Sequence, residues 1–340
     1  MPKITVAEVK IIAVRALRGQ GIPEVSATAI AEEMALAEYM EIKTHGLGKL
    51  ISLNIGDLTV KPTFSGAGPI FHVDGNKGNG FLTFSAVANE LIKRTAQHGV
   101  AVATVSNTTR YSSLFPYPAK VARSGYVSIL MNSAGPAAVA PFGSIDPITG
   151  TNPICFSFPK DGGVHSFDMA TSEIVWGEIR QAALEARRLP SGPFLTAAGD
   201  VTSDPTNVNA VKVFGGAKGS ALNLAIEILA GILSRGNVGL QCRDEFDCGA
   251  LFIAIDPSSL GISTDDFARK VDTLFDDIRN ARPESASRPV RVPGDRGRSS
   301  ITIESVLQRE IEVPQAIIDM LARMAEGESV SELASNPLFN

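Results

Sequence analysis

Apolar residues in the first sixty positions recur at helical spacing. One set predicts a helix that stops at the Gly19-Gln20-Gly21 turn, and its members are Ile4, Val6, Val9, Ile12 and Val14. A second helix is predicted after Pro23 and Ser26, with apolar positions at Ile30, Met34, Ala37 and Met40. Pro, Ser and Gly then cluster between Pro62 and Pro69, which predicts a linker and a domain boundary.

From Ile70 onward, short apolar runs alternate with helical patterns. Strands are predicted over 70–73, 100–105, 126–131, 154–158 and 251–255. Helices are predicted over 81–97, 119–123, 173–188, 218–233, 263–278 and 313–324. Ser263 followed by Asp266 is typical of a capped helix start. The alternation predicts an α/β fold in which helices pack on a sheet.

The composition is that of an ordinary globular protein, with 44% hydrophobic and 20% charged residues in 340. A net charge of −5 argues against nucleic acid as the main partner, because phosphate binding needs a clustered basic face. No uninterrupted apolar run reaches membrane-spanning length, and the first residues lack a signal-peptide cleavage pattern. We therefore expect a cytoplasmic protein without a membrane partner.

The three cysteines, Cys155, Cys242 and Cys248, are odd in number and form no CxxC pair, so a disulfide framework is not expected. Cys242 and Cys248 flank an acidic stretch at 243–247 that suggests metal binding. Their spacing matches no standard zinc site, and we expect no metal.

The stretch Thr44-His45-Gly46-Leu47-Gly48-Lys49 carries the most distinctive candidate chemistry. If helix continues beyond it, His45 and Lys49 lie on one face about one turn apart. Imidazole suits proton transfer near neutral pH, and the lysine offers an anion anchor. The alternative is a histidine at an ordinary helix start, with Thr44 as its cap.

Further motifs follow in order along nearly the whole chain. They are Asp74-Gly75 with Gly78 and Gly80, Gly150-Thr151-Asn152-Pro153, Asp168-Met169-Ala170, Trp176-Gly177-Glu178, Lys218-Gly219 and Arg291-Val292-Pro293-Gly294-Asp295-Arg296. With the Thr-His-Gly stretch, they resemble the malate/L-lactate dehydrogenase type 2 family, also called the sulfolactate dehydrogenase-like reductases. The tail Ser113-Leu114-Phe115-Pro116 is similar to that of the Δ1-piperideine-2-carboxylate/Δ1-pyrroline-2-carboxylate reductase branch.

The resemblance implies a sulfolactate dehydrogenase-like fold. Its α/β domain binds the nicotinamide cofactor in a non-Rossmann manner, and the turn at Gly78 and Gly80 indeed lacks the third glycine of the Rossmann fingerprint. We expect this domain over residues 66–298, and a helical domain over 1–65 completed by 299–340. The resemblance also implies a homodimer.

Three groups of site residues are implied by the resemblance. His45 is the proton donor, and Thr44 and Glu178 form a relay with it. The substrate is contacted by Lys49, Thr151, Trp176 and Gly177. The cofactor is contacted by Arg110, Tyr111, Ser112, Ser113, Leu114, Asp168, Met169, Ala170, Lys218, Gly219, Arg291, Pro293, Gly294, Asp295 and Arg296.

Several of these residues also fit ordinary structural roles. Arg110 stands where most of the family has a histidine, and it suits either a surface loop or a cofactor contact. Asp168 suits a helix cap, and Glu178 suits an exposed helix position. Lys49 replaces the usual arginine, so it offers a point charge instead of a two-pronged donor. Lys218 at a helix start favours a nearby phosphate.

The implied activity is NAD(P)H-dependent reduction of a small cyclic 2-imino acid, Δ1-pyrroline-2-carboxylate or Δ1-piperideine-2-carboxylate, to proline or pipecolate. Arginines at positions 288, 291, 296 and 298 favour NADPH, although NADH stays open. One alternative is a dehydrogenase of an open-chain 2-hydroxy acid, acting on 2-oxo acids in reverse. Another is a non-catalytic nucleotide- or metabolite-binding homologue.

Overall fold

A seven-stranded sheet organises the computed structural model, which describes residues 2–42, 45–52, 59–111, 113–184, 186–285, 288–295 and 303–328. The strand order is β2 (Thr63–Ser65), β3 (Ile70–Gly78), β4 (Val100–Thr108), β11 (Gly249–Ile255), β5 (Val127–Asn132), β7 (Ile154–Lys160) and β8 (Gly163–Met169). β3 and β4 are parallel, and the other neighbouring pairs in this described sheet are antiparallel. The mixed α/β architecture is as predicted.

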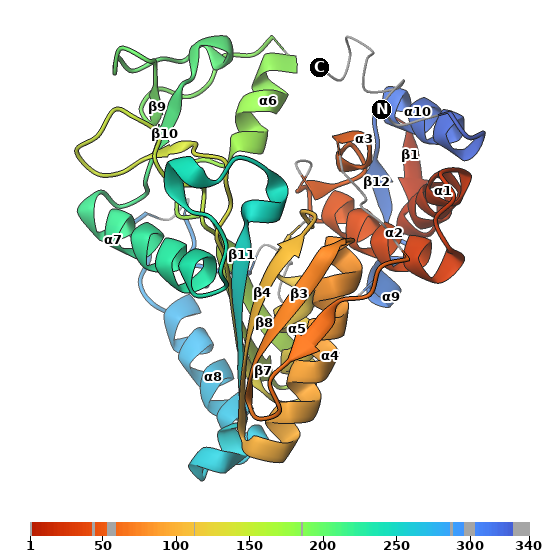
Figure 1. Cartoon of the computed structure of the whole chain (residues 1–340), viewed down its shortest axis with the longest axis vertical. Helices are drawn as coiled ribbons and strands as arrows, with labels where there is room; N and C mark the ends of the chain where they lie inside the picture. The colour runs from red at the N-terminus through yellow and green to blue at the C-terminus, as the bar shows by residue number, and fades with distance from the viewer. Residues whose placement is uncertain are drawn as a thin grey trace.

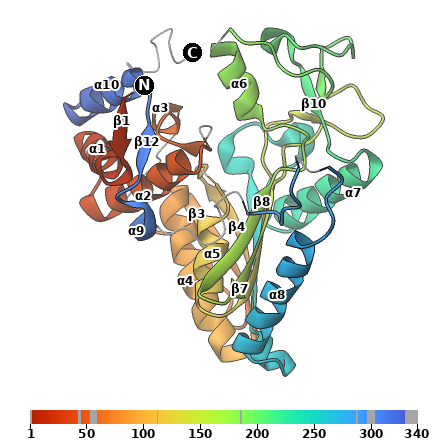
Figure 2. The same cartoon turned by 180° about the vertical axis from the view of Figure 1, so that it is seen from behind.

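Helices cover both faces of the sheet (Figures 1 and 2). On one face lie α4 (Gly80–His98) and α5 (Pro116–Arg123). On the other lie α7 (Ala217–Ile226), the π-helix η3 (Glu227–Ile232) that continues it, and α8 (Thr264–Arg279). Alternation along β5 shows why both faces are covered: Leu130 joins the core under α4 and α5, whereas Ile129 packs with the core under α7.

The two ends of the chain meet beside the sheet. β1 (Lys3–Thr5) pairs antiparallel with β12 (Glu310–Glu312), and α1 (Val6–Gly19) packs on α10 (Gln315–Ala325). α2 (Glu24–Tyr39), α3 (Lys49–Ser52) and α9 (Ile303–Val306) belong to the same layer, which Figure 1 shows in red and blue. The first helix begins at Val6, because a capping box of Thr5 and Glu8 fixes its start and leaves Ile4 in a strand.

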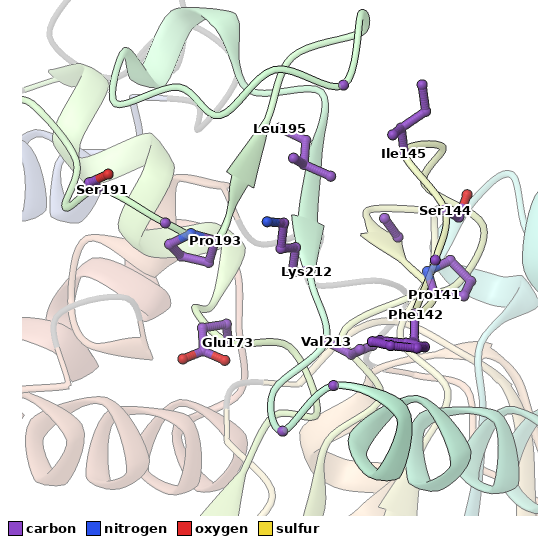
Figure 3. Close-up of a pocket in the computed structure, with 16 residues that line it drawn as sticks. Pro141, Phe142, Ser144, Ile145, Glu173, Ser191, Pro193, Leu195, Lys212 and Val213 are labelled. Atoms are coloured by element: carbon purple, nitrogen blue, oxygen red, sulfur yellow. The ribbon is translucent and has the colours of Figure 1, made fainter.

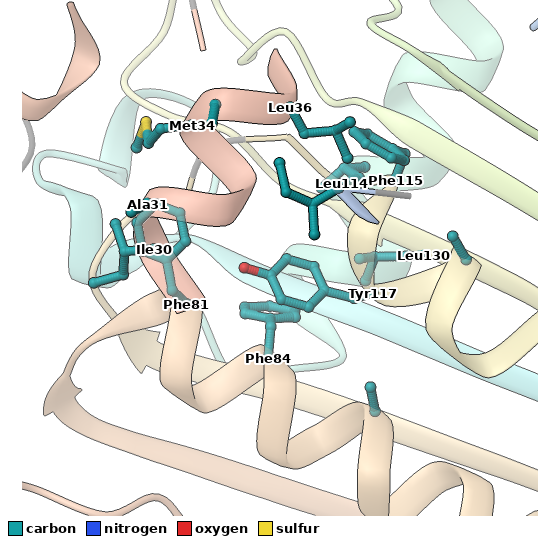
Figure 4. Close-up of a cluster of buried hydrophobic side chains, with 14 of the residues drawn as sticks. Ile30, Ala31, Met34, Leu36, Phe81, Phe84, Leu114, Phe115, Tyr117 and Leu130 are labelled. Atoms are coloured by element: carbon teal, nitrogen blue, oxygen red, sulfur yellow. The ribbon is translucent and has the colours of Figure 1, made fainter. Parts of the chain in front are cut away.

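This terminal layer shares one hydrophobic core with the sheet. Ile30 and Met34 of α2 pack in the same cluster as Phe81 and Phe84 of α4, with Tyr117 of α5 beside them (Figure 4). β2, which precedes residue 66, pairs with β3 of the main sheet. The division into domains at residue 65 therefore stays a prediction, and α4 joins α2 to the core beneath the sheet.

A smaller sheet and several short elements complete the fold. β6 (Val139–Ala140), β10 (Ala210–Lys212) and β9 (Phe194–Leu195) form the three-stranded sheet. The predicted helix over 173–188 is shorter in the structure, where α6 covers Trp176–Leu184. The 3-10 helices are η2 (Pro205–Asn207), η4 (Gly239–Gln241), η5 (Glu245–Asp247) and η6 (Pro257–Leu260). Across the described ranges, no helix has the length and apolar character needed to cross a membrane.

Candidate active site

A cavity of about 900 Å³ opens at the edge of the main sheet where β4, β5 and β8 end and β7 and β11 begin. This volume lies in the range of small-molecule and cofactor sites. Residues from several separate segments of the chain meet there. The sequence-predicted site residues that line it are His45, Lys49, Arg110, Tyr111, Ser113, Leu114, Thr151, Asp168, Met169, Ala170, Trp176, Gly177, Pro293 and Gly294.

His45 reaches the cavity on a tight turn after α2. Its backbone N–H donates to the Ile42 carbonyl at 2.8 Å, and the N–H of Leu47 donates to Oε1 of Glu38 at 2.8 Å. Glu38 is only 2% exposed. Its carboxylate occupies the space beside Gly46, where an added Cβ would lie 2.2 Å from Oε1. A buried carboxylate therefore holds the backbone next to His45.

Helix α3 begins only at Lys49, so the turn at His45 is not part of it. His45 and Lys49 nevertheless both line the cavity, which places an imidazole and an ammonium group on its wall. Thr44, the third member of this predicted group, lies outside the described residues.

Thr151 is positioned by a buried polar network. The Asn152 amide donates to Oε2 of Glu227 at 2.5 Å and to the Asn223 carbonyl at 3.1 Å. Asn223 in turn donates to the Gly150 carbonyl at 3.0 Å, and the Thr171 hydroxyl donates to the Thr151 carbonyl at 3.0 Å. These bonds tie the turn before β7 to α7 and η3.

Gly150 in the same turn is also required by packing. A Cβ there would lie 1.8 Å from the Ala134 carbonyl oxygen, and Ala134 lines the cavity. The turn at Gly150 and the 134–138 rim of the cavity are therefore in close packing contact. This arrangement holds the Thr151 backbone at the cavity wall.

Asp168 at the end of β8 holds the segment between β4 and α5. Its Oδ2 accepts the N–H groups of Leu114 at 2.9 Å and Phe115 at 3.2 Å. Asp168 thus does not cap a helix of its own, because it lies within a strand. The carboxylate binds the two amides that precede α5 and still faces the cavity.

Arg110 and Tyr111 close the neighbouring wall. Nη2 of Arg110 donates to the Gly135 carbonyl at 2.8 Å, and the Tyr111 hydroxyl donates to Oδ1 of Asn132 at 3.1 Å. The Tyr111 ring packs on Phe84 with centroids 3.9 Å apart. Burial, together with the charge of Asp168, holds the pKa of Tyr111 well above its usual value, so its phenol stays a donor.

Five predicted site residues do not line this cavity. Glu178 of α6 forms an exposed ion pair with Arg187, with Oε1 and Nη2 2.7 Å apart. Asp295 binds Arg279 of α8 at 2.7 Å and accepts the Val292 N–H, so its carboxylate braces the loop. The others, Lys218, Gly219 and Arg291, also lie outside the lining. Ser112 and Arg296, predicted cofactor contacts, lie outside the described residues.

Pro293 and Gly294 are brought to the cavity by contacts that the sequence did not reveal. The His165 ring of β8 lies 2.6 Å from the Pro293 carbonyl through Nε2 and packs on Phe275 of α8 at 4.2 Å. Burial lowers the pKa of His165. The neutral ring therefore serves as a donor that fastens this loop to the sheet.

A second, more open cavity of about 610 Å³ lies between the small sheet and the loop at 141–145 (Figure 3). Lys212 of β10 and Glu173 border it, and so do Gly215 and Gly216 just before α7. Lys218 is close to this second cavity in the chain but is not part of its lining. The described residues contain no cluster of histidine, cysteine and acidic side chains suited to a metal ion.

The sequence interpretation missed Glu38, Asn223 and Glu227. All three are polar residues at positions that their helices bury. Glu38 stands among the apolar residues of α2, and Glu227 among those of η3. A lone acid on a buried helix face is the signal that points to such residues, because burial of an unpaired charge is costly.

Comparison with known proteins shows which family has this fold. The model of the malate/L-lactate dehydrogenase family matches residues 4–322. The chain belongs to this family. Its members are NAD(P)-dependent dehydrogenases and reductases, so the chain is an NAD(P)-dependent oxidoreductase and the non-catalytic alternative is set aside.

Relatives of two kinds are similar to this family member. Δ1-Pyrroline-2-carboxylate reductase 2 of Burkholderia multivorans is 31% identical, over 95% of this chain and 97% of its own. L-Sulfolactate dehydrogenase of Methanocaldococcus jannaschii is also 31% identical, over 82% and 84%. The solved Δ1-piperideine-2-carboxylate reductase of Pseudomonas syringae pv. tomato superposes with a TM-score of 0.81 at 28% identity, covering 95% and 100%.

Proposed function

We propose that this enzyme reduces a small cyclic 2-imino acid, Δ1-pyrroline-2-carboxylate or Δ1-piperideine-2-carboxylate, with NADPH. The observation that supports the proposal best is the meeting of His45, Lys49 and Thr151 with Asp168 in one cavity. A proton donor and two anion-binding groups thus share a site with residues suited to a nicotinamide nucleotide. Several relatives at 30–32% identity are named as reductases of these imino acids.

The cavity residues fit a nicotinamide cofactor by size and chemistry. Apolar side chains of Leu114, Phe167 and Trp176 line the cavity, and the Arg110 guanidinium offers donors beside them. In the proposed site the cofactor is held by Arg110, Tyr111, Ser113, Leu114, Asp168, Met169, Ala170, Pro293 and Gly294. When bound, the cofactor supplies the hydride.

The protein's own groups bind the substrate and manage its proton. Lys49 neutralises the substrate carboxylate and the Thr151 segment orients it, while Trp176 and Gly177 border the ring. His45 protonates the imine nitrogen, because a protonated imine is the better electrophile and imidazole titrates near neutral pH. Glu178 is left out of this relay, since its carboxylate pairs with Arg187 outside the cavity.

The finer architecture is part of the same proposal. We assign cofactor binding to a non-Rossmann α/β unit, flanked by the helical layer that the two chain ends form. The basic 288–298 region favours NADPH, since Pro293 and Gly294 of this loop border the cavity. A cytoplasmic homodimer remains the expected form.

The test follows NADPH oxidation at 340 nm with purified protein. Δ1-Pyrroline-2-carboxylate, Δ1-piperideine-2-carboxylate, pyruvate and oxaloacetate are compared, each with NADPH and NADH. Turnover confined to the cyclic imines is expected. His45→Ala should lower that turnover by about two to four orders of magnitude and leave cofactor binding intact. Unchanged turnover in this variant would remove His45 from the mechanism.

The second candidate is a dehydrogenase of an open-chain 2-hydroxy acid. It is favoured by the sulfolactate dehydrogenase relative, which is as similar in sequence as the reductases. A cavity with a lysine, a histidine and a threonine also fits a 2-oxo acid. Turnover of pyruvate or oxaloacetate alone, in the same assay, would establish this candidate.

A further inference from the structure

Two of the three cysteines converge on one residue of the cavity rim. An added Cβ on Gly135 would lie 2.0 Å from Sγ of Cys242, so that sulfur packs directly against the glycine. Sγ of Cys248 lies 4.0 Å from the Gly135 carbonyl oxygen. Gly135 and Cys248 both line the cavity, whereas Cys242 is 6% exposed behind the rim.

The loop between the two cysteines is a compact turn, and both of their sulfurs lie beside Gly135. Oδ2 of Asp247 accepts the N–H groups of Arg243 at 2.8 Å and Asp244 at 3.3 Å, which closes a compact turn. η5 occupies the rest of the loop, and β11 begins directly after Cys248. The pairing of β11 in the sheet therefore anchors one end of this turn.

The electrostatic environment distinguishes the two thiols. A hydrogen bond with Cys242 lowers the pKa of Cys248 against the effect of burial, and Arg110 lowers it further. The same hydrogen bond, together with burial, raises the pKa of Cys242. Cys248 is thus the better nucleophile at the cavity, and Cys242, whose thiol donates to the Asp244 carbonyl at 3.8 Å, is its protonated neighbour.

We infer that Cys248 and Cys242 form a peroxide-sensitive thiol pair that closes to a disulfide at the rim of the cavity. Hydrogen peroxide oxidises the Cys248 thiolate to a sulfenic acid, as its O–O bond breaks and hydroxide leaves. Cys242 sulfur then attacks the Cys248 sulfur, the S–O bond breaks, and water leaves with the Cys242 proton. The two sulfurs together lose two electrons and peroxide gains them.

Disulfide formation should inactivate the enzyme through the cavity wall. Cys248 is part of the lining, and the Gly135 carbonyl beside it accepts the Arg110 guanidinium at 2.8 Å. Drawing the Cys248 sulfur toward Cys242 changes both contacts. The thiol pair does not depend on which acid the enzyme reduces, so its test stands apart from the substrate assay.

Tryptic mapping of the peroxide-treated protein tests the inference directly. Cleavage after Arg235, Arg243 and Arg269 places Cys242 and Cys248 on adjacent peptides, so a disulfide joins two peptides that otherwise separate. Cys155 lies on a third peptide. Its side chain is buried in the core, so it serves as the internal control. The expected result is the joined pair, with Cys155 still a thiol and full recovery of activity after dithiothreitol.

Two variants sharpen this test. Cys242→Ser removes the resolving thiol outside the cavity lining, so peroxide should oxidise Cys248 beyond sulfenic acid and dithiothreitol should no longer restore activity. Cys155→Ala is the matched control and should behave as the wild type. Equal oxidation of Cys155 and Cys248 in the wild type, or loss of activity without the joined peptides, would overturn the inference.

Discussion

Gly46→Ala is the substitution that tests most directly how the site is held. In the structure the added methyl would lie 2.2 Å from Oε1, 2.6 Å from Cδ and 3.0 Å from Cγ of the buried Glu38. Real carbon atoms do not approach so closely, so either the Glu38 carboxylate or the His45 turn must move. The first movement breaks the bond to the Leu47 N–H, and the second displaces the His45 imidazole, the proposed proton donor.

The size of the effect follows from these contacts. Forcing an extra methyl into packed space costs about 1–3 kcal/mol. Loss of the Leu47 hydrogen bond to a buried carboxylate adds about 1–3 kcal/mol. A displacement of the His45 ring by about 1 Å lowers turnover by up to ~100-fold. We therefore expect Gly46→Ala to reduce kcat by about 10- to 100-fold and to lower the melting temperature.

Gly48→Ala provides a matched control two residues away. The nearest atom to its added Cβ is Cδ1 of Ile317 at 3.7 Å, which is ordinary contact. Both variants are assayed by NADPH oxidation, and cofactor affinity is followed through the fluorescence of Trp176, the single tryptophan, which lines the cavity. Gly46→Ala should lose turnover with near-normal cofactor affinity, while Gly48→Ala stays close to the wild type.

Combining Gly46→Ala with Glu38→Asp separates positioning from general destabilisation. The shorter carboxylate vacates space for the new methyl, so the double variant should recover part of the lost kcat. Equal turnover of the Gly46→Ala and Gly48→Ala variants would refute the idea that Glu38 positions His45 through this turn. If Gly46→Ala loses kcat only in proportion to its loss of stability, and the double variant recovers none of the kcat, then Glu38 has a purely structural role.

Three further predictions concern other carboxylates. Glu178→Gln removes one partner of an exposed ion pair with Arg187, so it should cost about 0–1 kcal/mol of stability and change kcat less than about threefold. A loss of ~100-fold would restore Glu178 to the proton relay. Asp168→Asn weakens the charged acceptor of two backbone N–H groups, and NADPH affinity measured by titration should fall about tenfold. An unaltered affinity would remove Asp168 from the cofactor site. Burial raises the pKa of Glu33 to about 8, so between pH ~4.3 and 8 the folded protein retains a proton that the unfolded chain releases. The contribution of Glu33 to stability therefore falls as pH rises through this window. The melting temperature of Glu33→Gln minus that of the wild type should increase from pH 5 to pH 8. A difference that does not change with pH would contradict the raised pKa of Glu33.

Local sequence patterns predicted the long elements well because those elements carry their own signals. The predicted helix over 81–97 corresponds to α4, and the predicted strand over 100–105 lies within β4. Ser263 caps α8 by accepting the Asp266 N–H at 3.2 Å, as its spacing indicated. Such signals are read within a few neighbouring residues, so no knowledge of the tertiary fold is needed.

Other elements depend on partners that are distant in sequence. β8 contains His165, Ser166 and Asp168, a polar mixture that does not predict a strand. Its extended form comes from seven paired positions with β7. β6, β9 and β10 have only two or three residues each, too few for any period to appear. Their pairing is a consequence of the surrounding fold.

The candidate site shows the same division between local chemistry and distant support. Most of the described residues that the motifs predicted for the site do line the cavity, because residues such as His45, Thr151 and Asp168 stand in recognisable local contexts. The residues that hold them are Glu38, Asn223 and Glu227, and the last two act on a turn more than seventy residues away. A buried amide or carboxylate is stable there only if its partners arrive from other elements. The supporting polar network is therefore a property of the assembled fold, and it explains why α7 and η3 carry polar residues on the side that faces the cavity turn.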